Sequence, residues 1–223
     1  MTDSNYSHIT IVADRSGSMS NIRTDAEGAI NAFIQDQQKA EGRATLTLVD
    51  FDTEERFRVV FDDDLEGAPK YSLVPRGGTP LRDAIGLGIR QTGEKLACLD
   101  EDARPGNVFF VVQTDGQENS SVDWSQEAIN ELIKEHEEKF SWTFVFLATG
   151  PSAWQAAEMF KGTHMHSHNT VANSGGGNSH SHSVDYVSSN MAMTRGGHRI
   201  ASYAATVDDL GNVAKRDEEV TAP

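Results

Sequence analysis

The sequence has a single cysteine, Cys98, few basic residues and no long apolar run. One cysteine excludes an internal disulfide and a metal cluster built on thiolates. No segment reaches the run of about 20 apolar residues that a membrane-spanning helix needs. The formal charge of −15 argues against sequence-independent binding to nucleic acid or to an anionic membrane, because both depend on Lys and Arg neutralising phosphates. We therefore expect neither of these partners.

The first residues, Met-Thr-Asp-Ser-Asn-Tyr-Ser, also lack the basic region and apolar core of a secretory signal. We accordingly expect a cytoplasmic or virion-associated protein. With 223 residues, 37% of them hydrophobic, the chain can bury a sizeable core, and its length suits one domain with appendages. The predicted division is a domain over 7–200 and an acidic C-terminal extension over 201–223.

The most informative stretch is 9–20, an apolar run that ends abruptly in Asp14-x-Ser16-x-Ser18. The run has the pattern of a strand buried on both faces, and the turn after it gathers one carboxylate and two hydroxyls. A helix beginning near 19–24 would add backbone N–H groups and its positive dipole end. Because these oxygens favour a small hard cation, the turn predicts half of a magnesium site.

Two other loops supply the remaining oxygen ligands. Thr79 follows two glycines and precedes a helix that starts with Pro80, and Asp115 follows the apolar strand predicted over 107–113. Open α/β folds place their ligands at the carboxyl edge of the parallel sheet, where such loops converge. The candidate metal ligands are therefore Asp14, Ser16, Ser18, Thr79 and Asp115.

In order and character these five residues resemble the metal-ion-dependent adhesion site of von Willebrand factor A domains. The likeness is good over 7–150 and fades afterwards. It implies Mg²⁺, or alternatively Mn²⁺ or Ca²⁺, with Ser16, Ser18 and Thr79 contacting the ion directly or nearly so. The same likeness implies that Asp14 and Asp115 act directly or through water.

The resemblance also implies a ligand rim formed by Arg15, Gly78 and Gly116. Arg15 departs from the small, apolar or polar residue often found at its position in that family. Two interpretations of Arg15 stay open at this point. It either sits on the rim and meets an acidic partner, or it points to solvent.

Strand and helix patterns alternate along the chain and predict an α/β fold. We expect strands over 44–52, 107–113 and 142–148, an antiparallel edge strand over 54–62, and helices over 26–34, 80–99, 125–140 and 154–160. This order indicates a doubly wound, mostly parallel sheet with one antiparallel edge strand and helices on both faces. The family resemblance adds a last short strand over 169–171 and a closing helix over 184–193.

A histidine- and glycine-rich insertion is expected over 162–183. It holds five of the eight histidines: His164, His166, His168, His180 and His182. Histidines at period two on a strand point the same way, so two ribbons facing each other across a glycine turn could bind a transition metal. The alternative is a mobile polar loop. In a homo-oligomer, copies could also stack their histidines about an axis.

We expect a binding module rather than an enzyme. Metal-assisted hydrolysis needs a general base near the metal ion. We interpret His8 and His136 as surface residues, so neither is expected to act as that base. The motif also implies no His or Lys partner that would activate its serines as nucleophiles. The first hypothesis is a metal-dependent protein-interaction module whose ion takes an Asp or Glu of a partner protein. The alternative is a structural subunit of a larger assembly such as a phage virion, with the histidine-rich loop and the tail in subunit contacts.

Overall fold

The computed structural model describes residues 2–115, 118–149, 163, 170–173, 178–195, 205–207 and 213–215. These residues form one eight-stranded sheet with the strand order β3-β2-β1-β4-β5-β6-β7-β8. The strands are β1 (Asp3–Asp14), β2 (Arg43–Phe51), β3 (Arg58–Asp64), β4 (Pro105–Thr114), β5 (Thr143–Thr149), β6 (Thr170–Asn173), β7 (Ala205–Val207) and β8 (Val213–Lys215).

The predicted fold class is confirmed. The neighbouring strands β2, β1, β4, β5, β6 and β7 of the sheet run parallel. Strand β3 pairs antiparallel to β2 at one edge, as expected. A second antiparallel pairing, β7 with β8, lies at the other edge and was not predicted. The predicted helix over 154–160 falls outside the described residues.

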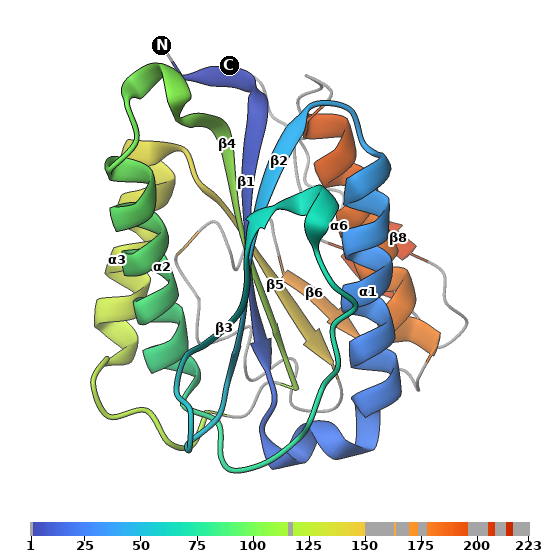
Figure 1. The fold of residues 1–223 in the computed structure, drawn as a ribbon. Helices are drawn as coiled ribbons and strands as arrows, with labels where there is room; N and C mark the ends of the chain where they lie inside the picture. Colours follow the sequence, from blue (N-terminus) through green and yellow to red (C-terminus); the bar gives the residue numbers. More distant parts are fainter. Residues whose placement is uncertain are drawn as a thin grey trace.

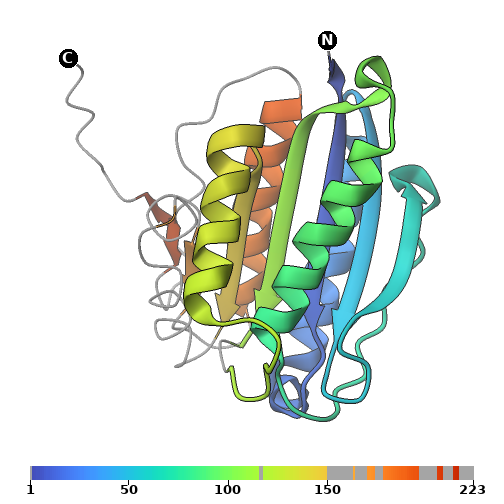
Figure 2. The same ribbon diagram turned by 90° about the vertical axis from the view of Figure 1, so that its left-hand side faces the viewer.

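Four α-helices of the described residues cover the two faces of the sheet. They are α1 (Arg23–Lys39), α2 (Leu81–Ala97), α3 (Gln126–Phe140) and α6 (Asn178–Arg195). Helices α1 and α6 lie side by side on one face, and α2 and α3 cover the other (Figure 1). The view turned by 90° shows the same layers, with the sheet between the two helix pairs (Figure 2). Three short 3-10 helices, Gly17–Ile22, Leu65–Gly67 and Glu101–Ala103, occur in the connections.

The core forms two clusters because successive side chains of a strand point to opposite faces. On β1, Ile9 and Ile11 pack in the cluster beneath α1 and α6, whereas Val12 packs in the cluster beneath α2 and α3. Each strand of a parallel sheet that is covered on both faces has a continuous apolar sequence. This is why the sequence alone indicates β1. The strands end in loops at one edge, and these loops carry the candidate site.

The closing helix α6 is fixed to α1 by a small polar contact. The side-chain amide of Gln37 donates to the Ser188 backbone oxygen at 2.7 Å. The Arg195 guanidinium donates to the backbone oxygens of Gln37 at 2.7 Å and Gly42 at 2.8 Å. The Arg195 side chain therefore supplies donors to backbone carbonyls at and beyond the end of α1.

None of the helices in the described part of the chain is long and apolar enough to span a membrane.

Candidate functional site

Asp14 is the last residue of β1 and organises the turn that follows it. Its Oδ1 accepts the Ser16 backbone N–H at 2.7 Å, and its Oδ2 accepts the hydroxyl of Thr114, at the end of the neighbouring β4, at 2.7 Å. The Ser16 and Ser18 hydroxyl oxygens lie 3.0 Å apart. The chain then enters the short 3-10 helix and reaches α1 at Arg23, so a helix does follow the turn as predicted. Three of the five predicted ligands thus share one turn.

The Thr79 loop is bonded to this turn along the backbone. The Gly17 N–H donates to the Gly77 carbonyl at 3.0 Å, and the Arg76 N–H donates to the Arg15 carbonyl at 2.8 Å. Gly77 has φ +65°, a conformation that glycine adopts without strain. These bonds hold the buried Thr79 in the loop beside the Ser16–Ser18 turn.

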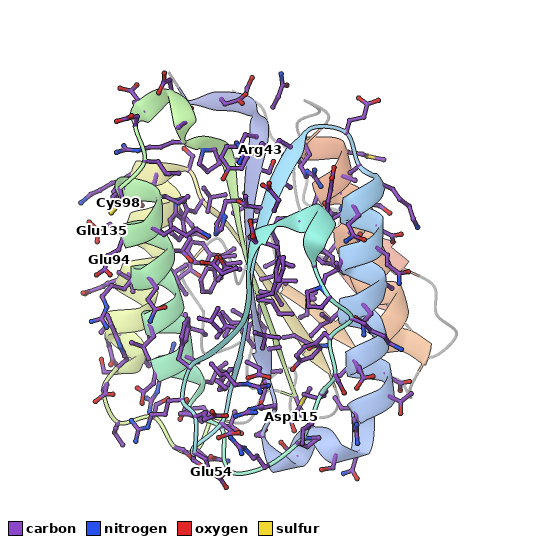
Figure 3. All side chains as sticks on the ribbon, viewed as in Figure 1. Arg43, Glu54, Glu94, Cys98, Asp115 and Glu135 are labelled. Atoms are coloured by element: carbon purple, nitrogen blue, oxygen red, sulfur yellow. The ribbon has the colours of Figure 1, made fainter. Side chains whose placement is uncertain are left out.

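The third loop begins with Asp115 directly after β4. The Asn119 side chain of this loop accepts the Thr79 N–H at 2.8 Å, and the Asn119 N–H donates to the Thr79 carbonyl at 3.2 Å. Figure 3 shows Asp115 at the same end of the molecule as Glu54, which follows β2. The structure therefore gathers the three ligand-bearing loops at the carboxyl edge of the sheet, as the sequence predicted.

The Asp14 carboxylate differs in one respect from the other fully buried acids. Asp14, Asp50, Asp52 and Asp83 all have an exposed fraction of 0%. Asp50, Asp52 and Asp83 each pair with at least one arginine. In the part of the chain that the structure describes, Asp14 has no cationic partner, although burying an unpaired charge is costly.

The pKa of Asp14 reflects its burial without a cationic partner among the described residues. The pKa of Asp14 is raised to about 7, mainly by burial and to a small extent by the charge of Asp115, while the hydrogen bonds from Thr114 and Ser16 oppose the shift. A divalent cation placed against Asp14 would supply the charge that the fold does not. The five candidate ligands fit a metal ion because the buried Asp14 carboxylate has no cationic partner among the described residues.

The donor set favours a hard cation. Two carboxylates and three hydroxyls suit Mg²⁺ or Mn²⁺, which prefer oxygen ligands and leave some positions to water. The described residues contain no cluster of three or more His, Cys, Asp or Glu side chains with metal-binding geometry. Hydroxyls are therefore needed to complete any ion site at this edge.

Both interpretations of Arg15 are wrong. The Arg15 side chain is only 3% exposed, and it forms ion pairs with Asp52 at 2.8 Å and with Asp50 at 3.4 Å, and a further one with Glu55. Acidic residues of the chain itself therefore hold this guanidinium inside the protein, away from the rim. Gly78 is partly buried, and Gly116 falls outside the described residues.

The histidine interpretations need correction as well. His8 is fully buried in β1, where Thr45 contacts its Nδ1 at 2.8 Å, and burial lowers its pKa to about 4. His136 is half-buried, with its ring centroid 4.6 Å from that of Trp142. The surface interpretation is therefore wrong for His8, whereas His136 is partly exposed.

The predicted histidine ribbon is also not supported in its second half. His180 and His182 lie in the helix α6, so the period-two strand geometry on which that hypothesis depended does not hold there. His164, His166 and His168 fall outside the described residues. The possibility of transition-metal binding by those three residues stays an expectation.

Sequence reasoning missed three supports of the site. Thr114 holds Asp14, and its place at the end of β4, directly before Asp115, could have indicated this. Asn119 holds Thr79, but an asparagine in a loop gives no signal of its distant partner. Glu118 is a further support, because its carboxylate accepts the Arg82 N–H at 3.0 Å and so fixes the loop to the start of α2.

A cavity of about 560 Å³ lies elsewhere. It opens between α2 and α3, near the amino ends of β4 and β5, and is lined by apolar residues that include Trp124 and Trp142. None of the candidate metal ligands lines it.

Comparison with known proteins agrees with this geometry at the level of fold. A von Willebrand factor type A protein from Catenulispora acidiphila superposes with a TM-score of 0.57 at 14% identity, over 83% of this chain and 42% of that one. The chain has the fold of a von Willebrand factor A domain. No protein-family model matches the sequence, and no curated protein does.

Two further structures resemble this von Willebrand factor A fold. Proximal thread matrix protein 1 from the mussel byssus, described with a zinc-occupied MIDAS motif, has a TM-score of 0.59 at 18% identity, over 84% of this chain and 46% of that one. The pilus adhesin SpaC from Lactobacillus rhamnosus GG has a TM-score of 0.58 at 12% identity, over 84% and 30%. The chain thus spans less than half the length of these proteins.

Proposed function

We propose that this chain is a divalent-cation-dependent protein-binding module. The buried carboxylate of Asp14, which has no cationic partner in the described structure, carries the proposal, because a cation at the carboxyl edge would neutralise it. Ser16, Ser18 and Thr79 would hold the ion, and Asp14 and Asp115 would act directly or through water. When bound, the ion supplies a Lewis-acidic position that a carboxylate can fill.

A partner's Asp or Glu side chain is the proposed ligand of the ion. Such an oxygen ligand suits the same hard cation as the protein's own donors. The similar structures support this proposal, since one is an adhesin and another is described with a metal in its MIDAS motif. Cation-dependent capture also fits a protein of net charge −15, because the ion offsets its repulsion of an acidic partner.

The described contacts favour binding over catalysis. The Ser16 hydroxyl contacts the Ser18 hydroxyl, and neither is within hydrogen-bonding distance of a basic side chain in the described residues. His8 is buried in β1 among threonine side chains, with Thr45 the nearest at 2.8 Å. A positioned nucleophile and base are the usual signature of hydrolytic catalysis, and this edge lacks them among the residues described.

The test is capture on an immobilised peptide library in which every Asp- or Glu-containing peptide has an Asn or Gln counterpart. The full chain should bind a subset of the acidic peptides in Mg²⁺ or Mn²⁺, bind none of the amide counterparts, and be released by EDTA. Thr79→Ala should lower the captured fraction. Equal capture of acidic and amide peptides, or capture unaffected by EDTA, would contradict the proposal.

Size measurement addresses the alternative of a structural subunit. A chain that binds acidic peptides through the ion should be released from its complexes by EDTA. An oligomer of the full chain that keeps its size in EDTA, without any cation-dependent peptide capture, would instead favour the structural role.

A further inference from the structure

Two arginines next to the metal loops share the same pair of acids. Arg15 lies within the Asp14–Ser18 turn, and Arg76 lies three residues before Thr79. Asp52 Oδ2 is 2.8 Å from Arg15 Nε and 2.7 Å from Arg76 Nε. Each loop thus contributes one guanidinium to one carboxylate.

Glu55 repeats the arrangement. One of its oxygens, Oε2, contacts the Arg15 guanidinium and lies 2.6 Å from Arg76 Nη2. The β2–β3 connection therefore bridges the two loops twice. Glu54 adds a pair with Arg76 at 3.2 Å, and Figure 3 shows Glu54 at the same end of the molecule as Asp115.

Asp52, the buried one of the two bridging acids, is firmly oriented. The second oxygen of Asp52 accepts the backbone N–H groups of Glu54 at 2.6 Å and Glu55 at 2.7 Å. Asp52 is fully buried, and Arg15 is nearly so. In such surroundings ion pairs are screened little by solvent, and a carboxylate with fixed hydrogen bonds has few alternative positions.

The rest of the fold does not depend on this bridging. The sheet is held by its own backbone pairing and two apolar clusters. The only backbone bonds that the described structure shows between the turn and the Thr79 loop are Gly17 to Gly77 and Arg76 to Arg15. The spacing of Ser16 from Thr79 therefore depends on local contacts of these loops, including the ion pairs of Arg15 and Arg76.

We propose that Arg15, Asp52, Glu55 and Arg76 form a charged clamp that sets the spacing between the Ser16–Ser18 turn and the Thr79 loop. The clamp residues are positioning residues, and cation affinity depends on them although none is a ligand. This inference rests on the proposed function, since it concerns the same cation site. It also assigns a role to Arg15, the residue that departs from the resembled family's pattern.

Arg58 provides a matched control. Arg58 is 40% exposed and holds the fully buried Asp50 through two guanidinium nitrogens, while Arg76 is 36% exposed and holds the fully buried Asp52. Arg58 pairs with Asp50 across the β2–β3 register and has no described contact with the Thr79 loop. Arg58→Gln and Arg76→Gln therefore remove similar charges, but only the second opens the clamp.

The sign of the effect separates the clamp from general electrostatics. Removing a positive charge near a cation site should tighten cation binding by Coulomb attraction alone. The clamp predicts the opposite for Arg76→Gln, a loss of about tenfold or more in Mn²⁺ affinity, the usual cost of losing a residue that orients metal ligands. Arg58→Gln should bind Mn²⁺ as tightly as the unaltered chain, or slightly more tightly.

The experiment measures Mn²⁺ affinity by electron paramagnetic resonance on the full chain and its variants. Glu55→Gln is a second clamp variant at an exposed carboxylate, for the case that Arg76→Gln does not fold. Because the loss of its negative charge weakens Mn²⁺ binding by Coulomb's law alone, this variant is tested by amide hydrogen exchange at Gly17 in EDTA, which should accelerate. Rescue by Arg76→Lys should be partial, because lysine provides one donor group in place of the planar fork. Equal affinities for Arg76→Gln and Arg58→Gln would overturn the clamp.

A second readout needs no metal. In EDTA, amide hydrogen exchange at Gly17 should accelerate in Arg76→Gln and stay unchanged in Arg58→Gln, because its bond to Gly77 crosses the clamped loops. Unchanged exchange in both variants would refute the clamp. If the unaltered chain binds no Mn²⁺, the proposed function fails, while this exchange measurement still decides whether the clamp exists.

Discussion

Replacing Asp14 by Asn should stabilise the metal-free protein while abolishing its cation site. Asparagine has nearly the same shape and can keep the hydrogen bond from the Ser16 N–H, and the Thr114 hydroxyl can turn to accept from the amide. It removes the buried charge that lacks a cationic partner in the described structure. The variant therefore imitates the protonated form of Asp14.

The size of the effect follows from the pKa of Asp14, which burial raises from 3.8 to about 7. A group whose pKa is raised on folding contributes stability that is complete below pH 3.8 and lost as the pH rises towards 7. The slope of about 1.4 kcal/mol per pH unit applies up to about pH 7 and levels off above it. The unaltered chain should therefore lose about 3 kcal/mol relative to Asp14→Asn between pH 5 and pH 8.

The assay is urea unfolding in EDTA at both pH values, comparing the free energy of unfolding of the two proteins. Asp83→Asn is the control, because Asp83 is equally buried but pairs with Arg56 at 3.2 Å and accepts three backbone N–H groups. That variant should be destabilised at pH 8. A constant difference between Asp14→Asn and the unaltered chain from pH 5 to pH 8 would refute the reasoning.

Four further substitutions test other parts of the account. Gly77→Ala should destabilise the fold by about 1 kcal/mol or more in urea unfolding and weaken Mn²⁺ binding, because its Cβ would lie 2.6 Å from Thr53 Oγ1 at a φ of +65°. His8→Gln should flatten the fall in stability between pH 6.5 and 4, since burial lowers the pKa of His8 from 6.5 to about 4 and protonation then favours the unfolded chain. An unaltered pH slope would contradict this. Thr79→Ala should weaken cation-dependent peptide capture more than it lowers the melting temperature, and equal capture would argue against its role. Replacing the five histidines of 164–182 together should leave Mn²⁺ affinity at the sheet edge unchanged, and a loss in titrations would show that the regions are coupled.

The sequence predicts most of the sheet because its strands are buried on both faces. Continuous apolar runs mark β1, β4 and β5, and the alternation of 54–62 correctly indicates an antiparallel edge strand. The loops after these strands then follow from topology, since parallel strands end at one edge. This is why the sequence alone places Asp14, Thr79 and Asp115 in one region.

The polar interior could not be predicted in the same way. Arg15 and His8 look like surface residues by type, and their burial depends on partners far away in sequence, Asp52 and Thr45. Residues 180–182 span less than one helical turn, so a spacing of two over this segment cannot distinguish a strand from a helix. The strand prediction for His180 and His182 is therefore wrong. Long-range ion pairs and side-chain bonds to loops leave no periodic pattern.

The most direct measurement is the anomalous difference density of Mn²⁺ in crystals of the full chain. The account predicts one peak at the carboxyl edge of the sheet, in contact with the hydroxyls of Ser16, Ser18 and Thr79 and within one water of Asp14 and Asp115. A fully occupied peak elsewhere, or no peak at saturating Mn²⁺ with the edge open to solvent, would contradict it.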